Sequence, residues 1–184
     1  MLLSIICHGN IARSQVLHHC LGKAAKETGL RVAVSSCGTA SEDSYGGVEG
    51  LLADVQQELH RRGFGGRVKR DWWTKHSEKR LLESDIVLAA DKDRRHVILM
   101  RLEGKIDPGK VYLFYEFIGE GERDFVDTYD QTRGAQDPDR FLSCFDELER
   151  IAGKITSRLM DIPERGVEVR NEPKHWLCFS RVCR

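Results

Sequence analysis

The stretch of sequence that decides the fold opens the chain and reads Met1-Leu2-Leu3-Ser4-Ile5-Ile6-Cys7-His8-Gly9-Asn10-Ile11-Ala12-Arg13-Ser14. Its apolar start predicts a buried strand over residues 3–6, and residues 14–28 predict a helix that Gly29 ends. A loop between such a strand and helix directs backbone N–H groups and the positive end of the helix dipole at one point. The sequence therefore predicts an anion-binding loop.

Cys7 and Arg13 give this loop its chemistry, at a spacing of C-x5-R. An arginine donates two parallel hydrogen bonds to phosphate oxygens, and a helix N-terminus beside a guanidinium favours the thiolate form of a cysteine. The spacing alone is weak in a chain with 29 Lys+Arg and 6 Cys, where a buried cysteine and a solvated arginine are the simpler explanation. The position between strand and helix, with Gly9 and Asn10 tolerating left-handed backbone, favours a nucleophile.

Strand-like and helix-like segments alternate along the rest of the chain. Further strands are predicted over 32–36, 85–90 and 111–114, and further helices over 47–62, 77–83, 92–102 and 141–160. This order predicts an α/β fold, as a single domain with a four-stranded twisted parallel sheet and helices on both faces. Ligands of such sheets bind at the carboxyl ends of the strands, where the Cys7 loop lies.

Composition narrows the class of protein further. The chain has 184 residues, of which 40% are hydrophobic, and its 29 basic and 29 acidic residues cancel. This balance gives no general affinity for nucleic acid or an anionic membrane surface. No apolar run approaches the roughly 18 residues of a membrane span, and no secretion signal is recognisable, so we expect a cytoplasmic protein. The cysteines show no metal-ligand spacing, and neither a metal nor another cofactor is expected.

Several segments, in order, resemble the low-molecular-weight protein tyrosine phosphatases, most closely the bacterial branch that acts opposite capsule-type tyrosine kinases. The family's loop reads C-x-G-N-[IV]-C-R-S-P, which residues 7–15 resemble except for Ala12 and Gln15. Residues 36–39 resemble its Ser-Ala-Gly-Thr segment, and residues 85–91 its Asp-Leu-Ile-Leu-x-Met-Asp run. The resemblance implies a phosphatase-like domain over residues 1–161, of the phosphotyrosine phosphatase I type, followed by a C-terminal extension over 162–184.

The resemblance also implies a function, the hydrolysis of phosphotyrosine through a phosphocysteine intermediate on Cys7. The substrate would be a phosphotyrosine protein, with a tyrosine kinase among the candidates. Arg13 would grip the phosphate, Ser14 would stabilise the thiolate, and Asn10 would hold the loop in a strained conformation with Ser36 as a partner. The residues expected to bind substrate are His8, Gly9, Asn10, Ile11, Ala12, Ser14 and, by stacking on the ring, Tyr45.

The proton donor for the leaving oxygen is harder to assign, because the Asp-Pro-Tyr segment of the family is missing. Asp127, Asp130 and Asp137 are the candidates. Asp137 lies close to the predicted helix start at 141. Asp130 matches the bacterial pattern D-P-Y-R-x-S-Q-D best, so we predict that Asp130 is the general acid and keep Asp127 as the alternative.

Two other functions fit the same loop. An arsenate reductase would use it on another oxyanion, but residues 76–90 lack the cysteine pair of the thioredoxin-coupled type. A non-catalytic phosphotyrosine-binding protein would tolerate an unusual acid segment, but it would not need Cys7. The family's second loop cysteine is replaced by Ala12, and Cys37 is the nearest candidate to substitute for it.

Overall fold

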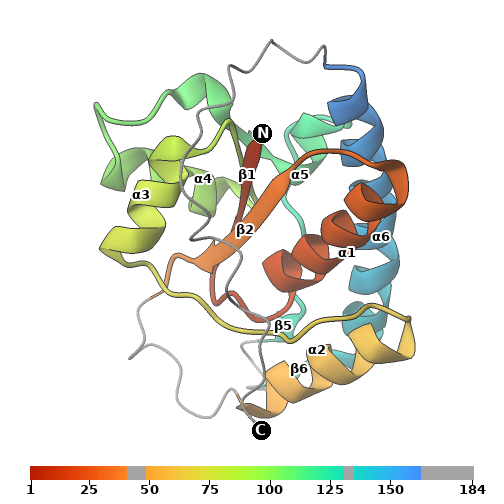
Figure 1. The fold of residues 1–184 in the computed structure, drawn as a ribbon. Coiled ribbons are helices and arrows are strands. Elements are labelled where there is room, and N and C mark those ends of the chain that lie inside the picture. The colour runs from red at the N-terminus through yellow and green to blue at the C-terminus, as the bar shows by residue number, and fades with distance from the viewer. Residues whose placement is uncertain (41–48, 131–134, 163–184) are drawn as a thin grey trace, which may run out of the picture.

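A computed structural model describes residues 1–40, 49–130 and 135–162 of the chain. Four parallel strands form one sheet in the order β2-β1-β3-β4 (Figure 1). Their bounds are Leu2–Cys7 for β1, Ala33–Gly38 for β2, Ile86–Ala89 for β3 and Val111–Leu113 for β4. The predicted α/β class with a four-stranded parallel sheet is confirmed.

Helices cover both faces of this sheet. The helices are α1 (Arg13–Thr28), α2 (Glu49–Arg61), α3 (Lys75–Glu83), α4 (Lys92–Arg101), the short α5 (Phe114–Phe117) and α6 (Pro138–Met160). Helices α1 and α6 pack against each other on one side of the sheet, and α3 and α4 lie on the other (Figure 1). No helix among the described residues is long and apolar enough to cross a membrane.

Strand alternation divides the apolar interior into two clusters, one on each face of the sheet. Leu3, Ile5 and Cys7 belong to the cluster under α1 and α6, whereas Ile6 belongs to the cluster under α3 and α4. Cys37 is the register partner of Ile6 and lies in that second cluster. Cys7 and Cys37 therefore face opposite sides of the sheet, an arrangement that does not favour Cys37 as a resolving thiol for Cys7.

Helix α6 begins at Pro138, three residues before the predicted start. The Asp137 side chain accepts hydrogen bonds from the backbone N–H groups of Asp139 and Arg140, both at 3.1 Å. An aspartate at the N-cap followed by proline in the first turn is a strong helix start, because the cap satisfies free N–H groups and proline needs no donor. Asp137 is thus a helix cap, in agreement with its exclusion as the acid.

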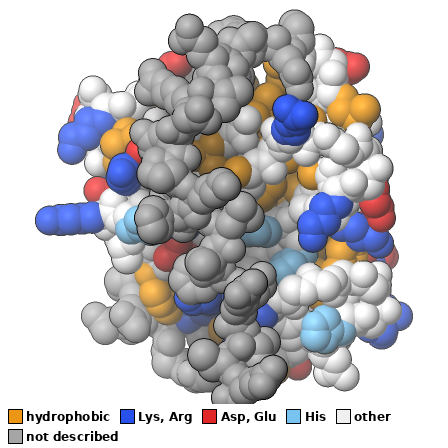
Figure 2. All heavy atoms as spheres, viewed as in Figure 1, with side chains coloured by type: hydrophobic (Ala, Val, Ile, Leu, Met, Phe, Trp, Pro, Cys, Tyr) orange, Lys and Arg blue, Asp and Glu red, His pale blue; other side chains and the backbone are white. Residues whose placement is uncertain are grey.

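The segment before α6 forms a small hairpin that the sequence did not predict. Strand β5 (Tyr129–Asp130) pairs antiparallel with β6 (Ala135–Gln136), and the Asp137 N–H donates to the Thr128 carbonyl at 2.9 Å. The hairpin lies at the same end of the molecule as the start of α1 (Figure 1). Lys and Arg side chains lie on both flanks of the face drawn in Figure 2.

His18 on α1 makes the fold sensitive to acid. Its Nδ1 lies 3.3 Å from the hydroxyl of Ser36. Burial, followed by the charges of His19 and Arg80, lowers the pKa of His18 to about 4. The unfolded chain takes up this proton near pH 6.5 and the folded chain only near pH 4, so stability is lost as the pH falls through this window.

We predict that His18→Gln removes up to about 3 kcal/mol of this acid-induced loss of unfolding free energy. Urea unfolding between pH 7 and pH 4 measures the effect. His96→Gln, at an exposed position on α4, is the matched control and should keep the wild-type pH dependence. Identical pH slopes for His18→Gln and wild type would contradict the assignment.

Candidate active site

The loop between β1 and α1 points its carbonyl groups outward. The carbonyl of Cys7 accepts from Thr39 N–H, and that of His8 accepts from Ala40 N–H, both at 3.0 Å. The carbonyl of Gly9 accepts from the Nε of Arg70 at 3.0 Å. Because the N–H of a trans peptide points opposite to its C=O, these bonds turn the next N–H groups toward the inside of the loop. The loop therefore presents donors to an anion.

The start of α1 adds further donors. Ala12 at the N-cap has no side chain that could accept from the first-turn N–H groups, and the first turn contains no acidic residue. Most helices satisfy these groups with a Ser, Thr, Asp or Asn cap. An uncapped and buried helix start next to a cysteine is suited to bind an external oxyanion.

A chain of hydrogen bonds runs from Asn10 to the sulfur of Cys7. Asn10 Nδ2 donates to Ser14 Oγ at 2.8 Å, and Ser14 Oγ lies 2.9 Å from Cys7 Sγ. Because the serine oxygen accepts from Asn10, its own proton can point at the sulfur and stabilise a thiolate. Asn10 has a φ of 51°, the left-handed conformation, and Gly9 does not. The loop strain expected at Asn10 is therefore present.

The other contacts of Asn10 differ from the expectation. Its Oδ1 accepts from Gln15 Nε2 at 2.7 Å and from the backbone N–H of Asp71 at 2.9 Å. The predicted partner, Ser36, instead contacts His18. Asn10 thus ties the anion loop to the segment before α3, a long-range contact that no local sequence pattern reveals.

Arg13 lies buried beneath the loop with its guanidinium between two carboxylates. Nη1 donates to Asp91 at 2.8 Å and Nη2 donates to Asp127 at 2.5 Å. Although burial opposes it, the charges of Cys7, Asp127 and Asp91 raise the pKa of Arg13, so the cation is permanent. Asp91, the N-cap of α4, holds the arginine in place from the end of β3. Sequence reasoning had not assigned Asp91 a role, although an acid at the carboxyl end of a buried strand was visible.

The remaining predicted residues have different outcomes. His8 is half-buried, and burial, then the charges of Arg94 and Arg13, lowers its pKa. Ile11 is buried in the loop wall. Tyr45 lies outside the described residues, and for Asp130 the structure describes the backbone in β5 but not the side chain. The choice of Asp130 as the acid therefore stays a prediction, whereas the carboxylate of Asp127 is placed at the site.

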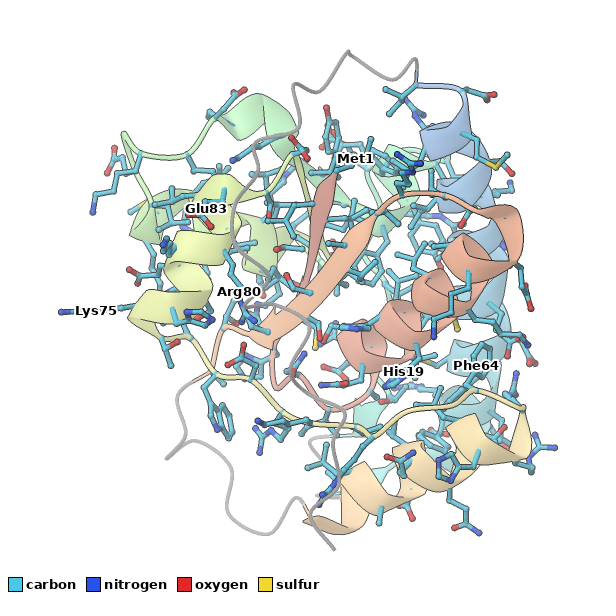
Figure 3. The ribbon with its side chains drawn as sticks, viewed as in Figure 1. Met1, His19, Phe64, Lys75, Arg80 and Glu83 are labelled. Atoms are coloured by element: carbon cyan, nitrogen blue, oxygen red, sulfur yellow. The ribbon has the colours of Figure 1, made fainter. Side chains whose placement is uncertain are left out.

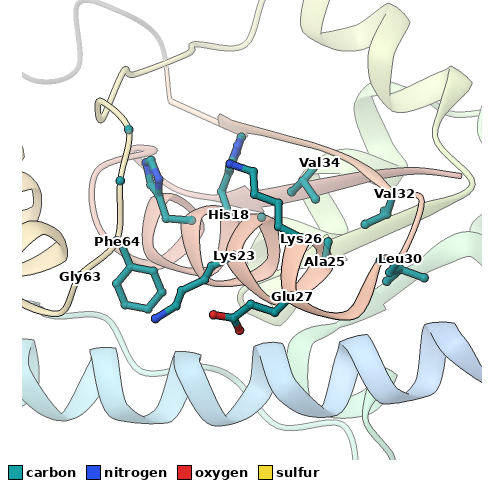
Figure 4. Close-up of a pocket in the computed structure, with 15 residues that line it drawn as sticks. His18, Lys23, Ala25, Lys26, Glu27, Leu30, Val32, Val34, Gly63 and Phe64 are labelled. Carbon is teal, nitrogen blue, oxygen red and sulfur yellow. The ribbon is translucent and has the colours of Figure 1, made fainter.

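Two features lie apart from this loop. Within the described part of the chain, no group of three or more His, Cys, Asp or Glu could hold a metal ion. A hollow of about 880 Å³ lies between α1, the start of β2 and residues 63–66, lined in part by His18, Lys23 and Phe64 (Figure 4). Figure 3 shows His19 and Phe64 on this side of α1, while Arg80 lies on α3 on the other side of β2.

The fold and site define a parallel α/β protein with a cysteine, an arginine and a row of backbone donors at one anion-binding loop. Residues 3–163 match the family described as low molecular weight phosphotyrosine protein phosphatase. The chain belongs to this family, and it is accordingly a phosphatase. No curated protein matches the sequence.

Solved structures with the same fold come from several bacteria. The YwlE arginine phosphatase, as a C7S mutant with a phosphorylated active site serine, is 20% identical, covers 89% of this chain and 98% of its own, and has a TM-score of 0.74. A low molecular weight protein tyrosine phosphatase from Bacillus subtilis is 19% identical. The match covers 87% of this chain and 97% of that protein, with a TM-score of 0.68. A low molecular weight phosphotyrosine phosphatase from Vibrio cholerae O395 is 18% identical. The match covers 88% of this chain and 97% of that protein, with a TM-score of 0.69.

Gly38 tests the packing of the loop against β2. A Cβ at this position would lie 2.6 Å from the His8 carbonyl oxygen and 3.1 Å from the Asn10 nitrogen, both backbone atoms. We predict that Gly38→Ala displaces the anion loop, lowers the unfolding free energy by about 1–3 kcal/mol and reduces the hydrolysis of aryl phosphates more than tenfold. Gly22→Ala in α1, where no atom lies within 4 Å, is the control and should be neutral or stabilising. Full activity of Gly38→Ala would contradict this packing.

Proposed function

We propose that this phosphatase hydrolyses phosphotyrosine in proteins through a phosphocysteine intermediate on Cys7. The observation that carries the proposal is the contact of Cys7 Sγ with Ser14 Oγ at 2.9 Å, at the uncapped start of α1 and above the buried Arg13. A thiolate, a fixed cation and inward N–H groups together suit nucleophilic attack on a phosphoryl group. The resemblance of the loop to the tyrosine phosphatases supports tyrosine as the substrate.

In the first step the Cys7 thiolate attacks phosphorus in line with the leaving phenol oxygen. A sulfur–phosphorus bond forms as the phosphorus–oxygen bond breaks, and a carboxylic acid gives its proton to the departing oxygen. The inward N–H groups of the loop and the fork of Arg13 hold the other phosphoryl oxygens, where charge is greatest in the transition state.

We propose Asp127 as the acid in this step. Its carboxylate is 47% exposed and contacts Arg13, so it lies at the mouth of the site and within reach of solvent and substrate. Asp130, the residue favoured from the sequence, lies three positions further along, in β5. The contact of its carboxylate with Arg13 supports Asp127 as the acid, while the side chain of Asp130 lies outside the described residues.

In the second step water attacks the phosphocysteine. Asp127, now a carboxylate, takes the proton of the water, the sulfur–phosphorus bond breaks, and inorganic phosphate leaves. Ser14, which receives a hydrogen bond from Asn10, stabilises the thiolate that departs. The same hydrogen bond thus serves the attacking and the leaving sulfur.

Phosphoarginine is the second candidate substrate, since two solved structures of the same fold are described as arginine phosphatases. Steady-state assays of phosphotyrosine and phosphoarginine peptides distinguish the two, and we expect the higher kcat/KM for phosphotyrosine. Faster hydrolysis of phosphoarginine would overturn the assignment of tyrosine. Reduction of arsenate with thioredoxin would favour an arsenate reductase, and binding without turnover would favour a non-catalytic protein. Among phosphotyrosine proteins, a tyrosine kinase stays a candidate for the natural substrate.

Cys7→Ser tests the covalent step. We predict that turnover falls at least a thousandfold, because a serine hydroxyl at its ordinary pKa is a poor nucleophile, while phosphate still binds to the unchanged donors. Hydrolysis of para-nitrophenyl phosphate and isothermal titration with inorganic phosphate measure the two effects. Wild-type turnover in this variant would rule out the phosphocysteine.

Asp127→Asn tests the acid. We predict a loss of about 10²–10⁴-fold with phosphotyrosine and a much smaller loss with an activated nitrophenyl ester, because a good leaving group needs no proton. Removing the negative charge beside Arg13 should also strengthen inhibition by inorganic phosphate. Asp130→Asn is the matched comparison. A larger dependence on the leaving group in Asp130→Asn would restore the assignment made from the sequence.

A further inference from the structure

Trp72 and Trp73, in the segment between α2 and α3, each hold an arginine against their ring. The guanidinium of Arg70 lies 3.4 Å from the centroid of the Trp72 ring, and that of Arg101 lies 4.8 Å from a ring centroid of Trp73. Stacking on an indole fixes the orientation of a planar guanidinium. The two cations come from separate parts of the chain, since Arg101 is the last residue of α4.

Both arginines also donate to carbonyls at the edge of the active site. Arg70 Nε donates to Gly9 in the anion loop at 3.0 Å, and Arg101 Nη1 donates to Thr39 at 3.2 Å. Thr39 in turn donates its N–H to Cys7, and its hydroxyl lies 3.5 Å from Nδ1 of His8. Arg70 therefore contacts the anion loop directly, and Arg101 contacts it through Thr39.

The tryptophans are themselves held in place. Trp73 Nε1 donates to Glu78 Oε1 at 2.6 Å, and the Trp72 carbonyl accepts from the Ser77 hydroxyl at 2.9 Å. Both contacts tie the pair to the first turn of α3. Asp71, which precedes Trp72, pairs with Arg80 on the same helix. The two arginine–tryptophan pairs form a preorganised rim rather than two independent surface side chains.

We propose that Arg70 and Arg101 select phosphoproteins with acidic residues next to the phosphorylated side chain. This inference rests on the proposed function, since the bound phosphate must anchor the peptide. Once the phosphate is held by the loop, the neighbouring residues of the peptide cross the rim, and carboxylates there meet fixed guanidinium groups. The chain as a whole carries no net charge, so this preference arises locally.

The test compares three phosphotyrosine peptides that differ only in whether glutamate, glutamine or lysine flanks the tyrosine. We expect wild type to hydrolyse the glutamate peptide with a kcat/KM about tenfold above that of the glutamine peptide at low ionic strength, with the lysine peptide slowest. Arg70→Gln and Arg101→Gln should each reduce this preference about two- to fivefold. Added salt should weaken the preference of wild type for the glutamate peptide. In the double variant, which has little of this preference, added salt should have little effect.

Para-nitrophenyl phosphate, which has no flanking residues, is measured beside the peptides. Its kcat/KM should stay at the wild-type value in Arg101→Gln. Arg31 is an exposed arginine just before β2, and Arg31→Gln should leave kcat/KM unchanged for every substrate. Equal rates on the three peptides in an enzyme active on para-nitrophenyl phosphate would overturn this inference alone. An equal loss on every substrate in both arginine variants would overturn it as well, because the arginines would then only support the loop. Absence of hydrolysis of all substrates by wild type would overturn the proposed function and this inference with it.

Discussion

The outward hydrogen bonds of the loop carbonyls are the constraint on which the active site depends. Three consecutive carbonyls, of Cys7, His8 and Gly9, are bound by donors from the end of β2 and from the segment before α3. Each bond fixes one peptide plane and so directs one N–H group inward. A loop without these partners would be free to turn its carbonyls toward the phosphate, where they would repel it. The site is therefore built by the tertiary structure around the loop as much as by the loop sequence.

The second constraint is the positive charge of Arg13, which lies buried beneath the anion loop. A guanidinium with so little exposure needs partners, and Asp91 and Asp127 supply them. The two carboxylates differ in setting, because Asp91 caps α4 whereas Asp127 is 47% exposed. Under the proposed function, the exposed partner, Asp127, is the one that a phosphate would displace from the fork. One arginine can thus remain paired before and after substrate binds.

Much of this structure could be predicted from local sequence. The strands of the sheet and the helices between them follow from apolar patterns, and Cys7, Arg13 and Ser14 from their place after the first strand. The start of α6 was placed three residues late because Asp137-Pro138 was weighed as an acid segment rather than as a cap. The anchors of Asn10, and Asp91 beneath Arg13, depend on contacts between residues about 60 to 80 positions apart. Such contacts leave no periodic signal in one sequence.

The segment before α3 contacts both the anion loop and the rim formed by the two arginine–tryptophan pairs. Its backbone holds the loop, through the Asp71 N–H on Asn10 and the Lys69 carbonyl on Gln15, while its Arg70 and Trp72 side chains face the rim. Backbone contacts keep their geometry when side chains change, so Trp72 and Trp73 can vary in size without removing these contacts, whereas the Arg70 side chain itself holds the Gly9 carbonyl. The side chains of this segment that face the rim can therefore change with little effect on the anion loop, apart from Arg70, which contacts both. Arg70 is thus the residue that links the constrained anion loop to the two arginine–tryptophan pairs.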